Sequence, residues 1–139
     1  MSETLIISIL AASITAGTPI LFAALGELIA ERSGIMNLGV DGMMLVGAVT
    51  GFMITVNTGN PWFGVGISLV AGALLALIHA YLTVTLRANQ VVSGLALTLF
   101  GSGLSDYLGK AYVGMRAEHT FGKLAIPGLS DIPIIGPVV

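Results

Sequence analysis

Long uncharged, apolar runs separated by short polar clusters occupy the first 108 residues of the chain. Residues 4–26 carry no charge over 23 positions, and about 20 apolar residues suffice to cross a bilayer core as a helix. Residues 42–78 are also uncharged, but the turn-forming cluster Asn-Thr-Gly-Asn-Pro at 57–61 divides them. The pattern predicts membrane-spanning helices at about 4–28, 40–56, 62–86 and 90–108.

Composition supports an all-α membrane protein, a polytopic transmembrane helical bundle of about four spans. Hydrophobic residues make up 55% of the chain and charged residues only 9%, against about 25% charged in soluble domains. We expect one transmembrane domain over 1–139, with a Gly- and Pro-rich loop at 109–139. That loop ends in an apolar stretch resembling the approach to another span, so we expect a partial chain. The absence of cysteine excludes disulfides.

Small and weakly polar residues recur at steps of three and four in the predicted spans, which places them on one helical face. In the third and fourth spans this inward face comprises Ser68, Gly72, Ala76, His79 and Thr83, then Gln90, Gly94, Thr98, Gly101 and Ser105. Such a face suits close helix packing or a water-filled path. The two explanations stay open, and Thr98 is a candidate for lining a path.

The connection between the first two spans, residues 27–42, has more polar residues and glycines than a plain connector needs. Gly34, Gly39 and Gly42 permit positive φ angles or close backbone approach. One interpretation places Asn37 and Asp41 beside a translocation path, because an acid deep in a membrane costs about 2.5–3.5 kcal/mol and needs compensation. The other places Asp41 at the interface as the N-cap of the second helix. Both interpretations remain open.

Other polar residues have simpler interpretations. His79 is interpreted as a hydrogen-bonded packing residue in preference to a proton relay. Asn89 and Gln90, beside Arg87, are interpreted as interfacial anchors. Arg32 and Arg87 place the first and third connections on the cytoplasmic side, although the basic residues after the fourth span nearly balance that count.

Two stretches carry a family resemblance. Residues 34–44 read Gly-Ile-Met-Asn-Leu-Gly-Val-Asp-Gly-Met-Met, preceded by Glu27 and Glu31-Arg32-Ser33, and residues 88–95 read Ala-Asn-Gln-Val-Val-Ser-Gly-Leu. From about residue 18 to 108 the chain resembles permease subunits of ATP-binding-cassette importers for simple sugars, nucleosides and branched-chain amino acids, especially the nucleoside and simple-sugar branch. The motif positions are Glu27, Gly34, Gly39, Gly42 and Gly94. Family members usually have Glu where this chain has Asp41.

The resemblance implies the amino-terminal half of a permease subunit, forming the path for a small polar solute such as a nucleoside or simple sugar. It implies a second permease subunit, cytoplasmic ATP-binding subunits and an extracellular or periplasmic solute-binding protein as partners. It also implies a multi-pass location in a bacterial or archaeal plasma (inner) membrane. The family's second half, including the cytoplasmic helix that engages the ATPase, has no counterpart here.

No nucleotide-binding Gly-x-x-x-x-Gly-Lys-Ser/Thr motif, metal-ligand cluster or catalytic constellation occurs in the sequence. We therefore expect no enzyme and no cofactor in this chain, with ATP and Mg²⁺ held by a partner ATPase. A membrane enzyme or its anchor is a competing hypothesis, for which only Asp41 and His79 lie deep enough. A second alternative is a small channel-forming or assembly subunit complete at this length.

Overall fold

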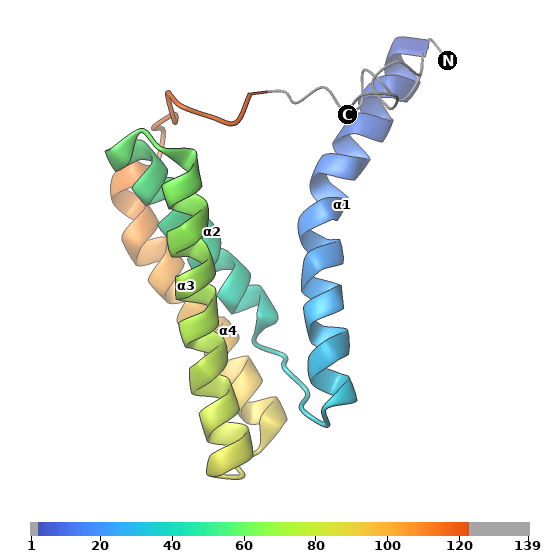
Figure 1. Cartoon of the computed structure of the whole chain (residues 1–139), viewed down its shortest axis with the longest axis vertical. Helices are drawn as coiled ribbons and strands as arrows, with labels where there is room; N and C mark the ends of the chain where they lie inside the picture. The colour runs from blue at the N-terminus through green and yellow to red at the C-terminus, as the bar shows by residue number, and fades with distance from the viewer. Residues whose placement is uncertain (1–2, 123–139) are drawn as a thin grey trace. The chain divides into compact units, whose positions relative to one another are not determined.

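Four long helices make up most of the structure, a computed structural model that describes residues 3–122. They are α1 (Glu3–Arg32), α2 (Val40–Thr58), α3 (Pro61–Ala80) with its π-helical continuation η1 (Tyr81–Thr85), and α4 (Gln90–Gly109) with the 3₁₀ turn η2 (Lys110–Tyr112) (Figure 1). Each of the four is long and apolar enough to cross a membrane. Residues 3–122 contain no strand. The predicted all-α, polytopic membrane fold is confirmed.

The helix ends fall close to the predicted spans. Helix α1 continues to Arg32, past the predicted end at residue 28, while α2 and α4 begin at Val40 and Gln90, as the sequence predicts. The predicted loop at 109–139 begins with the short turn η2, and its residues 123–139 lie outside the described residues. The described residues divide into two units, residues 3–25 with 122 and residues 26–121. One transmembrane domain over the whole chain stays a prediction.

In the first unit, helix α1 satisfies its polar side chains internally. Ser13, Thr15 and Thr18 donate their hydroxyl hydrogens to carbonyl oxygens four residues earlier, at 2.7 to 2.9 Å. Large apolar side chains such as Ile14 and Phe22 are exposed around them. A helix that presents apolar side chains and no unmet hydroxyl donor is suited to a lipid environment.

In the second unit, α2 contacts both α3 and α4, which contact each other little. Helices α2 and α3 form an antiparallel hairpin. Gly59 takes a left-handed conformation at φ 66° and Asn60 caps α3, accepting hydrogen bonds from the backbone N–H groups of Trp62 at 3.0 Å and Phe63 at 3.3 Å. Pro61 occupies the first helical position, where its missing N–H has no consequence. The predicted turn at 57–61 is confirmed.

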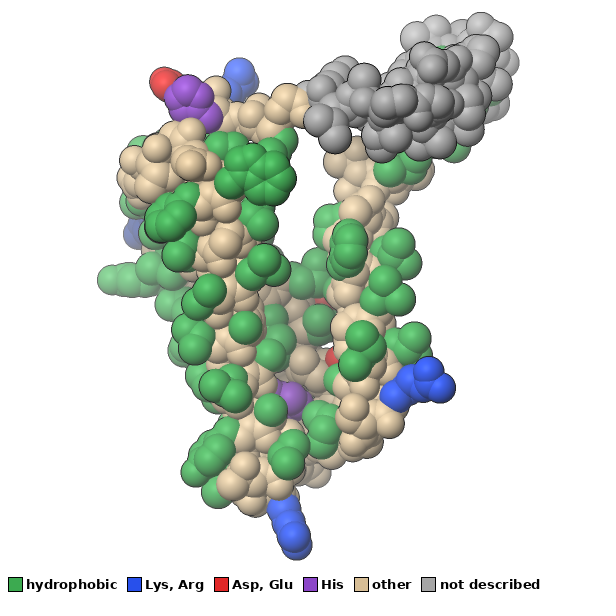
Figure 2. All heavy atoms as spheres, viewed as in Figure 1, with side chains coloured by type: hydrophobic (Ala, Val, Ile, Leu, Met, Phe, Trp, Pro, Cys, Tyr) green, Lys and Arg blue, Asp and Glu red, His purple; other side chains and the backbone are tan. Residues whose placement is uncertain are grey.

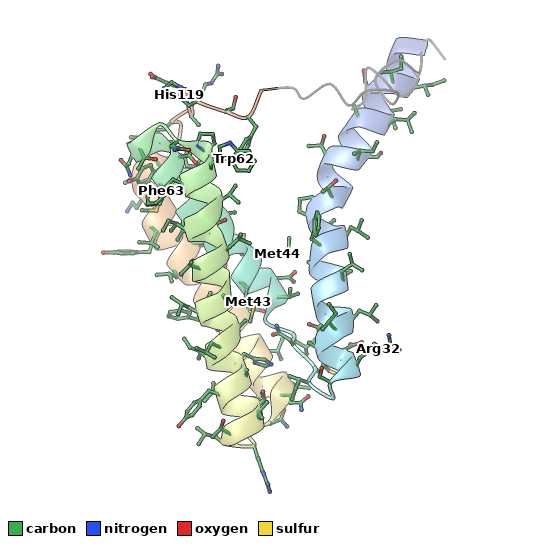
Figure 3. The ribbon with its side chains drawn as sticks, viewed as in Figure 1. Arg32, Met43, Met44, Trp62, Phe63 and His119 are labelled. Atoms are coloured by element: carbon green, nitrogen blue, oxygen red, sulfur yellow. The ribbon has the colours of Figure 1, made fainter. Side chains whose placement is uncertain are left out.

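Small residues and a few side chains after α4 complete this hairpin. A Cβ on Gly64 would lie 2.7 Å from the carbonyl oxygen of Gly51 and would also meet the hydroxyl of Thr55, so α2 and α3 pack closely there. The ring of Trp62, labelled at the start of α3 in Figure 3, lies 4.9 Å from that of Phe121. The visible faces of the helices carry mainly hydrophobic side chains (Figure 2).

Helices α2 and α4 run parallel, because successive contacts between them rise together in residue number. A Cβ on Gly101 would lie 2.5 Å from the Cα of Gly42, and the Ser105 hydroxyl donates to the Leu45 carbonyl at 3.4 Å. Farther along, the side-chain amide of Asn57 donates to the Tyr112 hydroxyl at 2.8 Å. The two parallel helices are therefore offset in sequence by roughly the same number of residues throughout.

Candidate functional site: the connection between α1 and α2

Residues 33–39 form a non-helical connection that lies along the first two turns of α4. The Gln90 amide binds it twice, donating from Nε2 to the Gly34 carbonyl at 3.2 Å and accepting at Oε1 from the Met36 N–H at 2.8 Å. Eight residues later, the Thr98 hydroxyl donates to the Leu38 carbonyl at 2.7 Å. An α-helix rises 1.5 Å per residue, so these contacts are about 12 Å apart along α4.

Side chains of α3 and α1 also bind the connection. His79 is 3% exposed, and its Nε2 lies 3.2 Å from the Met36 carbonyl oxygen while its Nδ1 lies 3.1 Å from the Ser93 hydroxyl. A carbonyl only accepts, so Nε2 carries the hydrogen and Nδ1 accepts from Ser93. Glu27 Oε1 accepts from the Asn37 N–H at 2.7 Å. Non-helical backbone is tolerated at membrane depth where protein meets its polar groups in this way.

The motif glycines serve two different purposes. A Cβ on Gly42 would lie 2.5 Å from the Leu97 carbonyl oxygen, and one on Gly94 would lie 2.8 Å from the Leu38 nitrogen. Gly39 is similarly close to the Leu97 side chain. Gly34 has open space around it but a φ of +83°, which favours glycine. Close approach therefore accounts for three of these glycines, and backbone conformation accounts for Gly34.

Two of the three path candidates hold the connection together. Asn37 Oδ1 accepts from the Gly39 N–H at 3.0 Å, and its Nδ2 lies 3.6 Å from the Met43 sulfur. Thr98 binds the Leu38 carbonyl. Asp41 differs, because its side chain is exposed and forms no hydrogen bond with any residue of 3–122. A path role for each of the three stays a prediction, and Asp41 alone has its polar group free.

The interpretation of Asp41 as the N-cap of α2 is wrong, and its position at the membrane interface stays a prediction. The N-cap of α2 is Gly39, no side chain caps that end, and Asp41 lies inside the first helical turn. The neighbouring Gly42 packs against Gly101, which lies 11 residues from Gln90 and so about 16 Å along a span of about 34 Å. Asp41, the second residue of α2, therefore lies level with the middle of α4. An acid at that depth in a membrane is expensive and marks a functional candidate.

The two carboxylate oxygens of Glu27 have different environments. One carboxylate oxygen accepts from Asn37, whereas Oε2 is buried and has no hydrogen-bond partner among residues 3–122. No group of three His, Cys, Asp or Glu in the described part of the chain could hold a metal ion. The connection is therefore a hydrogen-bonded backbone element, and Asp41, a carboxylate with no partner among residues 3–122, follows it in the first turn of α2.

Sequence reasoning missed the part played by Gln90 and Ser93. It gave Gln90 only an interfacial role, whereas the oxygen and the nitrogen of its side-chain amide both bind the connection. For Gln90 a signal was available, because it lies four residues before Gly94 and so shares the inward face of α4. The interpretation of His79 as a hydrogen-bonded packing residue is confirmed by its two partners.

Comparisons with known proteins agree with this architecture. Residues 9–132 match the family described as branched-chain amino acid transport system / permease component. A putative glucose ABC transporter permease protein of Haloferax volcanii is 51% identical over 92% of this chain and 40% of its own length. A guanosine ABC transporter permease protein of Bacillus subtilis is 35% identical over 94% of this chain and 44% of its own length. A nucleoside ABC transporter permease protein of Lactococcus lactis is 32% identical over 87% and 41%.

No solved structure matches the chain. The chain spans less than half the length of these curated relatives and covers their amino-terminal part. With four apolar helices and bacterial and archaeal relatives, it is a multi-pass plasma-membrane protein. The match over residues 9–132 includes the whole connection and every residue whose side chain binds it, and the chain belongs to the permease-component family of branched-chain amino acid transport systems.

Proposed function

We propose that this chain is the amino-terminal part of the permease subunit of an ATP-driven importer and that it helps to form the path of a small polar solute. The observation that carries the proposal is the family match over the bonded connection, joined with relatives that are named ABC transporter permeases. The free carboxylate of Asp41 near mid-span supports it, because transporters bind solutes near the bilayer midplane beside interrupted helices.

The proposed solute is a nucleoside or a simple sugar. The three relatives are named for glucose, guanosine and nucleosides, all of which carry a sugar ring with hydroxyl groups. An ionised carboxylate only accepts hydrogen bonds and binds hydroxyl donors strongly. Asp41 is accordingly proposed to accept from a solute hydroxyl, while Asn37 and Thr98 border the path through the backbone that they hold.

The chemistry that drives import is assigned to other subunits. The sequence lacks a phosphate-binding loop, so ATP and Mg²⁺ are proposed to bind cytoplasmic ATPase subunits. A second permease subunit and an extracellular or periplasmic solute-binding protein complete the proposed assembly. In this scheme the permease is not an enzyme, and its helices change arrangement when the partner hydrolyses ATP.

The test is to co-express the full encoded polypeptide with candidate ATPase and solute-binding subunits and to measure solute-stimulated ATP hydrolysis in proteoliposomes. Stimulation by a nucleoside or sugar that Asp41→Asn abolishes, and that Glu31→Gln on an exposed site retains, is the expected result. A stable assembly that admits solute without any ATPase would overturn the proposal and favour a channel-forming or assembly subunit.

A further inference from the structure

Gln90 and His79 both bind Met36 of the connection, from two helices that contact each other little. Gln90 on α4 binds Gly34 and Met36, and His79 on α3 binds the Met36 carbonyl. An apolar groove of about 290 Å³ lies between α3 and α4, with His79 and Ser93 in its lining. Across this groove, α3 and α4 are linked by the Ser93–His79 hydrogen bond. They are also linked through Met36, which both Gln90 and His79 bind.

These bonds replace the ones that a helix would form internally. If residues 33–39 were helical, their carbonyl and N–H groups would bind within the segment. Gln90 and His79 meet the groups at Gly34 and Met36 instead, which stabilises the extended course. That course decides how far along α4 the next helix begins, because α2 starts only after the connection has passed Gly94 and Leu97.

We propose that Gln90 and His79 are positioning residues that hold residues 34–36 against α4 and thereby set the depth at which α2 begins and Asp41 lies. Ser93 supports them by fixing the ring of His79 in the tautomer that donates to Met36. The consequence for solute binding rests on the function proposed above, but the positioning itself does not.

A substitution of Gln90 can remove its bond to Gly34 and keep its bond to Met36. Gln90→Glu keeps the size and the acceptor for Met36 but replaces the donor with an oxygen facing the Gly34 carbonyl. Asn89→Asp is the matched control, since it makes the same charge change one residue away. Asn89 caps α4 by accepting from the Val92 N–H at 3.1 Å, and aspartate caps as well as asparagine does.

The chain contains no cysteine, so a single introduced cysteine is its only thiol that a maleimide can label. Val40→Cys, beside Asp41, is labelled with a membrane-impermeant maleimide in sealed vesicles that hold the full polypeptide in its complex. Ser68→Cys, at the contact between α2 and α3, is the control reporter. With Gln90→Glu we expect labelling at position 40 to rise about tenfold, because one hydrogen bond is lost and two acceptor oxygens then face each other. Labelling at position 68 should not change. Asn89→Asp is expected to change neither rate.

Ser93→Ala keeps the test decisive if Gln90→Glu does not accumulate in the membrane. It removes only the donor to His79 Nδ1, so a smaller rise confined to position 40 is expected. Unchanged labelling at position 40, or an equal rise at positions 40 and 68, would overturn the proposal. Under the proposed function, Ser93→Ala also raises the KM for solute while the ATPase still co-purifies. If solute transport proves absent, the labelling result stands by itself.

Discussion

The two ends of α2 are built in opposite ways. At its carboxyl end the chain turns with residues adjacent in sequence, Gly59, Asn60 and Pro61, and the capping bonds reach only two or three positions. At its amino end, no side chain of α2 caps the helix. The preceding backbone is instead held by Glu27, 10 positions away, and by residues 43 to 60 positions away. One end is a local structure and the other is a tertiary one.

This difference predicts how each end responds to change. Damage to the Gly59–Asn60 turn should stay near that turn, because its bonds are short in sequence. Damage to α4 should displace the start of α2, because α4 holds the connection that precedes it. Free energies of unfolding, measured together with labelling at position 40, separate the two responses.

The largest effect is expected where α2 and α4 approach most closely. Gly101→Ala places a methyl group 2.5 Å from the backbone of Gly42, which only a shift of one helix can relieve. We expect a loss of about 3 kcal/mol or more, seen as a lower midpoint of thermal unfolding in detergent. Gly103→Ala on the same helix meets nothing within 4 Å and should leave the midpoint unchanged or raise it. Equal midpoints for both variants would contradict close packing at Gly101.

The same contact can be tested from α2. Gly42→Leu should prevent assembly, because its side chain would enter the backbone of Leu97 and Thr98. The measurement is the monodisperse fraction recovered with partner subunits after size-exclusion chromatography. Normal recovery of the complex would show that the two helices need not approach at this point.

A middle-sized effect is expected from the hydroxyl that holds Leu38. Thr98→Val keeps the shape but removes the donor to that carbonyl, which should cost about 1 to 3 kcal/mol for a polar group left unmet. It should also speed labelling of Val40→Cys. Thr50→Val, whose hydroxyl binds only carbonyl oxygens of its own helix, is the control. If both valine variants unfold alike, the bond to Leu38 contributes nothing specific.

A smaller effect, confined to the other end of α2, is expected from Asn60→Ala. It removes the cap of α3, worth about 1 kcal/mol, and Asn60→Asp should restore it. Labelling at position 40 should not change in either variant. Faster labelling at position 40 would mean that the two ends of α2 are coupled and that the turn at Asn60 is not a local structure.

The smallest loss of stability is expected from Asp41→Asn. The carboxylate has no partner among residues 3–122 and an acid at membrane depth is costly, so removing its charge should not lower the free energy of unfolding. Solute-stimulated ATP hydrolysis should nevertheless fall strongly. A variant that loses stability but keeps transport would assign Asp41 to folding instead of the path.

The predictability of the fold follows the same division. The turn at 57–61 and the four apolar runs are local signals, and the structure confirms both. The contacts of Gln90 with the connection were not predicted, and the capping role given to Asp41 is wrong, because both depend on where the connection runs. That course is decided by His79, Ser93 and Thr98, on helices that come later in the chain. Local periodicity carries no information about which backbone such side chains meet.

The long reach of the Thr98–Leu38 bond, 60 residues, also has a consequence in time. A ribosome adds about 5–20 residues each second, so roughly 3–12 s separate the synthesis of Leu38 from that of its partner. Helix α1 can enter the bilayer at once, since its hydroxyls bind its own backbone. The start of α2 must wait, with Asn37 and Asp41 already made, until α4 emerges. During that interval the nascent chain carries an unfinished polar segment that the insertion machinery has to shield from lipid.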